Sequence, residues 1–138
     1  MKSRRAGQGP RLSIPDEVRR FVLTSIASVP HLEALLLFHR DPQAWRDGVA
    51  VAKALYVTEP KAIGVLEDLH AAALLDVDPG PPMRFRLDPG SVELPEIIRL
   101  VALAYANDVV GMTHLIHDAA GKNAMRFAAA FKLKKSDV

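Results

Sequence analysis

Cysteine is absent from this chain of 138 residues, which excludes disulfide bonds, thiol chemistry and cysteine-ligated zinc sites. Aromatic residues make up only 6% of the sequence, but 49% of it is hydrophobic, which is ample for a core and excludes a wholly disordered chain. No apolar run approaches the roughly 20 residues of a membrane span, and no apolar signal segment follows the first basic residues. We therefore expect a single cytoplasmic domain that makes no contact with a membrane.

The net charge is also small, at +2, and the charged residues are unevenly distributed along the chain. Residues 1–30 hold six basic and two acidic side chains, residues 31–90 six and nine, and residues 91–138 six and five. Neutralisation of phosphates by Lys and Arg supplies most of a protein's affinity for DNA. The acidic middle of the chain therefore counts against a DNA-binding surface there. The first 13 residues are predicted to be a flexible basic arm, which either follows a phosphate backbone or serves as a solubilising tail.

Between residues 45 and 73 the sequence predicts two helices joined by a tight turn. Asp47 suits the N-cap of the first helix, whose Val51 and Leu55 lie four residues apart. The turn is predicted at residues 56–58, and the Thr58 hydroxyl then caps the second helix. Pro60 suits the first turn of that helix, where a missing N–H group costs nothing. The buried stripe of the second helix is predicted to be Ala62, Val65, Leu66 and Leu69.

After Ala73 the apolar residues recur with a period of 2 residues instead of 3.6, which predicts a two-stranded ribbon. The strands are residues 74–78 and 83–87, and the Pro-Gly-Pro-Pro tract at 79–82 forms the loop between them. In the second strand apolar residues alternate with Arg84 and Arg86, so one face is apolar and the other cationic. Trp45 lies where a short third strand would pair with this ribbon, and we expect it to be a core anchor.

These elements, in this order, resemble the winged helix-turn-helix superfamily, broadly in the manner of MarR-, PadR- and ArsR-like bacterial regulators. The residues that carry the resemblance are Val51-Ala52, Leu55-Tyr56-Val57-Thr58, Leu66, Leu69, Leu74-Leu75, Arg84 and Arg86. The resemblance implies a mainly α fold with a small β-hairpin: a winged helix-turn-helix domain with flanking N- and C-terminal helices. The expected divisions are an arm at 1–13, the winged-helix domain with its leading helix at 14–90, and a C-terminal helical segment at 91–138.

The region from about residue 92 to 118 is predicted to be one long helix, with Gly111 as the place of a kink. It carries more apolar surface than one helix of a small domain needs. Because winged-helix regulators often dimerise through helices outside the wing, we expect a homodimer formed by residues 92–135 with help from residues 15–29, and intramolecular packing is the alternative. The predicted interface residues are Ile98, Val101, Tyr105, Met112 and Ile116.

The resemblance implies that the second helix enters the major groove of double-stranded DNA while the wing touches phosphates. The residues expected to position a DNA-binding transcriptional regulator are Thr58, Lys61, Arg84 and Arg86, assisted by Lys53, Arg4, Arg5 and Arg11. For the two wing arginines a second interpretation is open, in which they pair across the ribbon with Asp76 and Asp78.

The outward positions of the second helix favour another class of function. They include Ile63 and Gly64, where many relatives carry polar side chains that read base edges. An outward isoleucine suits a protein partner better than a base, so the alternative function is a winged-helix module for protein–protein contact. A third possibility is a regulator whose helical flank binds a small apolar effector.

No catalytic motif is present, and we expect neither an enzyme nor a cofactor. His114 and His117 are one turn apart and are the only residues with metal-like spacing. A metal site needs at least one further ligand, and no other histidine is placed nearby by the sequence. We therefore expect solvated or hydrogen-bonded histidines rather than a metal site.

Overall fold

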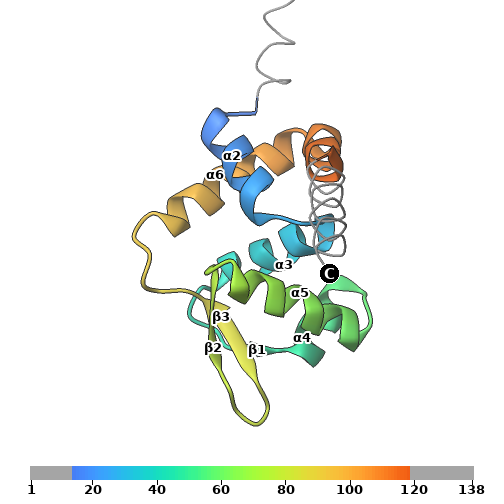
Figure 1. Ribbon diagram of the computed structural model, residues 1–138, viewed down its shortest axis with the longest axis vertical. Coiled ribbons are helices and arrows are strands. Elements are labelled where there is room, and N and C mark those ends of the chain that lie inside the picture. The colour runs from blue at the N-terminus through green and yellow to red at the C-terminus, as the bar shows by residue number, and fades with distance from the viewer. Residues whose placement is uncertain (1–13, 119–138) are drawn as a thin grey trace, which may run out of the picture.

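The computed structural model describes residues 14–118, and its elements carry the labels of Figure 1. In chain order they are α2 (Asp16–Ser25), α3 (Val29–Arg40), β1 (Arg46–Asp47), α4 (Gly48–Leu55), α5 (Glu59–Ala71), β2 (Leu75–Asp78), β3 (Arg84–Leu87) and α6 (Leu94–Asn107). A further helical segment covers residues 109–118. The prediction of a mainly helical fold with a small antiparallel sheet is confirmed, and the order α3, β1, α4, α5, β2, β3 is consistent with a winged helix-turn-helix.

Helices α4 and α5 form the helix-turn-helix and pack against each other. Both predicted N-caps are confirmed. The Asp47 carboxylate accepts the N–H of Ala50 at 2.9 Å, and the Thr58 hydroxyl accepts the N–H of Lys61 at 3.3 Å. The turn begins at Tyr56, which adopts a left-handed conformation with φ 59° and ψ 44°. These local interactions set where each helix begins and ends before any tertiary contact is considered.

The sheet has the order β1-β3-β2, and both pairings are antiparallel. The register is Arg46 with Phe85 and Asp47 with Arg84 in one ladder, and Leu75 with Leu87, Asp76 with Arg86, Val77 with Phe85 and Asp78 with Arg84 in the other. Directly opposed residues share a face, so one face is mostly apolar and the other carries the charges. The short third strand is confirmed. Trp45, however, is only half-buried and lies beneath the Arg86 guanidinium, so its predicted role as a core anchor is wrong.

The buried side chains of residues 14–118 form one apolar cluster that spans all the helices. Helix α6 packs on α2 and α3, at the end of the molecule away from the hairpin tip (Figure 1). Residues beyond the wing therefore share the core of the winged helix. By length and composition no single helix of this part of the chain is a candidate membrane span. Only α2 and α3 taken together, bent by 112°, pass that test, and both contribute to the core.

The prediction of one long helix after the wing is wrong, because this region consists of two helices that meet at Asp108. Asp108 leaves the helical region, with φ −150° and ψ 76°, and its carboxylate accepts the N–H of Gly111 at 2.9 Å. The residue therefore ends α6 and caps the segment that follows. Any side chain at Gly111 would collide with this carboxylate, so the glycine accommodates the cap rather than marking a kink inside one helix.

Four of the five side chains predicted to form a dimer interface are fully buried within a single chain. Ile98, Val101, Met112 and Ile116 have no exposed surface, and they belong to the same cluster as the core of α2 and α3. A side chain without exposed surface cannot be covered by a second molecule. The alternative of intramolecular packing therefore holds for these four residues. Tyr105, the fifth, is only half-buried.

Candidate interaction surface

The two wing arginines are paired within the sheet, as the second interpretation of the sequence expected. Arg84 donates to Asp78 at 2.6 Å, and Arg86 donates to Asp76 at 3.4 Å. The guanidinium of Arg86 also lies 4.5 Å from the centre of the Trp45 ring. The hydrogen bond from Arg84 is the largest cause that lowers the pKa of Asp78, which keeps this carboxylate ionised. Both arginines are thus partly neutralised by acids on the same face of the sheet.

Few other cations of the described residues are available on this side. Residues 46–88 hold five basic and seven acidic side chains. The guanidinium of Arg46 makes a cation–π contact with Phe38, and its carbon lies 5.3 Å from the centre of the ring. Lys53 and Lys61 are exposed and form no ion pair within residues 14–118, while the Thr58 hydroxyl serves as the cap of α5. Three further predicted DNA contacts lie outside the described residues, namely Arg4, Arg5 and Arg11.

An apolar hollow of about 160 Å³ lies where the starts of α4 and α5 meet the wing. Val49, Ile63 and Met83 line it and are exposed by 44%, 37% and 47%. Asp47 and Glu59 also line it, and no basic residue of the described chain does. In a winged helix that binds DNA, this is the region that faces the groove and the phosphates. Here it combines exposed apolar side chains with carboxylates.

Two glycines shape the surface around Ile63. A Cβ atom on Gly48 would lie 2.8 Å from Cγ1 of Ile63, so the glycine allows this side chain to rest against the start of α4. Gly64, in the interior of α5, has nothing within 4 Å of the place where its Cβ would stand. The Ile63 side chain thus rests against the start of α4 and is partly exposed to solvent on its outer side. Beside it, the helix backbone at Gly64 carries no side chain. Such a backbone permits the close approach of another chain.

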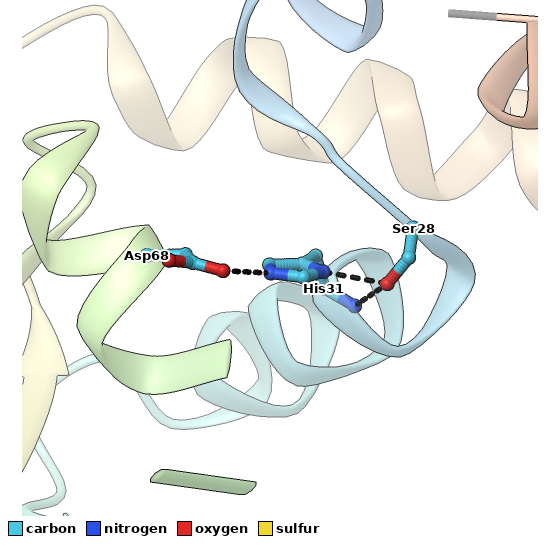
Figure 2. A network of polar contacts seen from close by, with 3 residues as sticks. All are labelled: Ser28, His31 and Asp68. Carbon is cyan, nitrogen blue, oxygen red and sulfur yellow. Dashed lines mark hydrogen bonds and ion pairs between the residues drawn. The ribbon is translucent and has the colours of Figure 1, made fainter. Parts of the chain in front are cut away.

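The structure brings together three polar residues that the sequence analysis did not connect, as Figure 2 shows. His31 is buried in α3, and its Nε2 lies 2.8 Å from Oδ2 of Asp68 in α5. Its Nδ1 lies 2.6 Å from the hydroxyl of Ser28, which also accepts the backbone N–H of His31 at 3.4 Å. The separation of 37 residues between His31 and Asp68 leaves no local signal in the sequence.

Ser, His and Asp together are the residue types of hydrolytic triads, but this group is better explained as a link between two helices. The carboxylate accepts from Nε2–H, so in the neutral ring Nδ1 accepts the hydroxyl proton of Ser28. The serine oxygen is already engaged as the N-cap of α3. Each polar atom of the buried ring is thereby satisfied, and α3 is joined to the back of α5.

Comparisons with protein-family models, curated proteins and solved structures find no match to this chain. The function of its surfaces therefore has to be inferred from their own chemistry. Within residues 14–118 no three histidine, aspartate or glutamate side chains come together as a metal site. His114 and His117 are both exposed at the end of the described chain.

Proposed function

We propose that this chain is a winged-helix module for protein–protein contact, which uses the apolar hollow between α4, α5 and the wing. The observation that carries the proposal is the exposure of Val49, Ile63 and Met83 around one hollow. Interfaces concentrate their binding free energy in a few apolar anchors that fill such depressions. Ile63 is the central residue of this surface, because the missing side chain of Gly48 leaves room for it against the start of α4.

The charges at the hollow specify the chemistry of the partner. Asp47 and Glu59 border the apolar side chains, and Glu67 adds an exposed carboxylate farther along α5. Complementary charge steers association and disfavours partners of like charge. The expected partner is therefore a protein segment with a large apolar side chain, such as leucine or phenylalanine, flanked by lysine or arginine.

DNA binding is the second candidate, and the order of the winged-helix elements favours it. A DNA regulator would place the start of α5 in the major groove, with Lys53 and Lys61 near phosphates. Against it stand the excess of acids over bases in residues 46–88 and the ion pairs of Arg84 and Arg86. The protein-contact proposal accounts for the apolar hollow as well, which DNA binding leaves without a purpose.

Two variants of the full chain separate these functions. The first is Ile63→Asp, which places a charge in the hollow, and the second is the double variant Lys53→Gln/Lys61→Gln, which removes the two exposed lysines of α4 and α5. The full chain is immobilised and proteins of the source organism are captured at moderate and at high salt. We expect the wild-type chain to capture one specific protein, which stays bound at high salt. Ile63→Asp is expected to reduce the captured amount of this protein by roughly tenfold or more, whereas the double variant captures it as the wild type does.

The matching experiment measures binding to random-sequence duplex DNA at low and moderate salt. If DNA is bound at micromolar concentration, with affinity that falls steeply with salt and disappears in the lysine double variant, the protein-contact proposal is wrong and the chain is a DNA-binding protein. Sedimentation of the wild-type chain completes the test. A dimer that Ile63→Asp dissociates would identify the partner as a second copy.

A further inference from the structure

A second and larger hollow, of about 480 Å³, lies between α3, the end of α4 and α6. Leu36 and Leu37 of α3 line one side of it. From α4 and α6, three small residues (Ala54, Ala102 and Ala106) line it together with Leu55 and Tyr105. Because alanine side chains do not fill the space between the helices, the hollow stays open. Its volume lies within the range of about 300–1,000 Å³ that is typical of sites for small ligands.

The two ends of this hollow carry opposite charges. Glu33 and Arg40 both line it, and neither takes part in an ion pair or a side-chain hydrogen bond within residues 14–118. They are seven residues apart on α3 and thus on one face, separated by roughly 10 Å along the helix axis. Tyr105 also lines the hollow, where burial and then the Glu33 carboxylate raise the pKa of its phenol, so this group remains a hydrogen-bond donor to a higher pH than a free tyrosine.

Tyr56 lies at the rim of the hollow in an unusual conformation. Its side chain is 94% exposed, and its backbone is left-handed, a region that favours glycine after the end of a helix. A bulky residue at this position strains the backbone and gains almost no packing against residues 14–118. Strain of this kind is retained where a side chain serves a contact outside the folded chain. Tyr56 is therefore placed to cover a ligand in the hollow.

We propose that this hollow binds a short apolar peptide with free ends, with its amino group at Glu33 and its carboxylate at Arg40. An extended chain covers about 3.3–3.6 Å per residue, so the separation of the two charges corresponds to roughly three residues. Leu36 and Leu37 contact the apolar side chains of the peptide, and the Tyr56 ring covers them. This site is separate from the surface around Ile63.

The test is calorimetric titration of the full chain with trileucine and with its two blocked forms. N-acetylation removes the ammonium group, and C-terminal amidation removes the carboxylate. We expect saturable binding of trileucine, weakened roughly two- to fivefold by either block, which is the range for partly exposed ion pairs. Glu33→Gln is expected to weaken trileucine by the same factor and to leave the acetylated peptide unaffected, and Arg40→Gln to behave likewise with the amide.

The variant Tyr56→Gly separates binding from folding. It removes the covering ring and places glycine where the backbone favours it, so binding is expected to fall at least fivefold while the melting temperature stays level or rises. Ala73→Gly is the matched control, because Ala73 is also left-handed but does not line the hollow; it should leave binding unchanged. No saturable binding at millimolar trileucine, or equal binding of the doubly blocked peptide, would overturn the proposal.

Discussion

Ala73 is the position at which stability responds most simply to a single substitution. It follows α5 with φ 65°. Its N–H bonds to the carbonyl of His70 at 2.9 Å, and the N–H of Leu74 bonds to the carbonyl of Leu69 at 3.0 Å, which together form a Schellman motif. Glycine is the usual residue at this place, since a left-handed conformation costs other residues about 1–2 kcal/mol. Ala73→Gly is therefore expected to stabilise the chain.

The magnitude follows from comparison with the neighbouring alanine. Ala72 is also exposed, but its φ of −82° is accessible to any residue. Glycine raises the entropy of the unfolded chain at either position, at a cost of about 0.5–1 kcal/mol. Only Ala73→Gly also relieves the left-handed strain. The net result is a gain of about 0.5–1 kcal/mol for Ala73→Gly and a loss of about the same size for Ala72→Gly.

Urea and thermal unfolding of the two variants measure this difference. For a chain of 138 residues, 1 kcal/mol corresponds to about 3–5 °C in melting temperature. The unfolded-state contribution is common to both variants, so their difference isolates the strain at Ala73. Equal melting temperatures, or a lower value for Ala73→Gly, would refute the strain argument and remove the basis of the Tyr56→Gly experiment as well.

Three further predictions concern other parts of the fold. Gly64→Ala should raise the free energy of unfolding by about 1 kcal/mol, because the added methyl meets nothing within 4 Å; a loss in urea unfolding would contradict this. His31→Ala should lower the free energy of unfolding by about 2 kcal/mol and Asp68→Ala by about 1 kcal/mol, and the effects should not add in the double variant. Strict additivity would mean that the hydrogen bond between His31 and Asp68 in Figure 2 does not contribute to stability. Asp78→Asn should make the free energy of unfolding depend less on pH in the acid range. Because Arg84 holds the folded pKa of Asp78 below its ordinary value of 3.8, the stabilisation is present above that pH and is lost as the pH falls through the folded pKa; an unchanged acid slope would argue against the ion pair.

Local patterns predicted the helix-turn-helix and the ribbon correctly because the forces that form them act over a few residues. The caps at Asp47 and Thr58, the change of period after Ala73, and the alternation of Phe85 with arginines are all visible within short stretches. The same patterns predicted a kink at Gly111 but not the break at Asp108. A run of apolar residues at helical spacing continues through that position, whereas the backbone of Asp108 leaves the helical region and its carboxylate caps the next segment.

The candidate surface was predicted only in part, for a related reason. The sequence alone identified Ile63 as an outward apolar residue and raised the pairing of Arg84 and Arg86 with neighbouring acids. It could not show that Val49 and Met83, from α4 and the wing, gather around Ile63. That gathering depends on the packing of elements distant in the sequence.

The sequence by itself thus determined the kinds and order of the elements, because periodicity, capping and turn residues act locally. Tertiary structure decided which apolar faces are used up inside the chain and which remain for a partner. The sequence predicted that Ile98 and Ile63 would each contact a partner, yet Ile98 is fully buried and Ile63 is 37% exposed. Only the packing of α6 on α2 and α3, and the absence of any described element over the start of α5, distinguishes them.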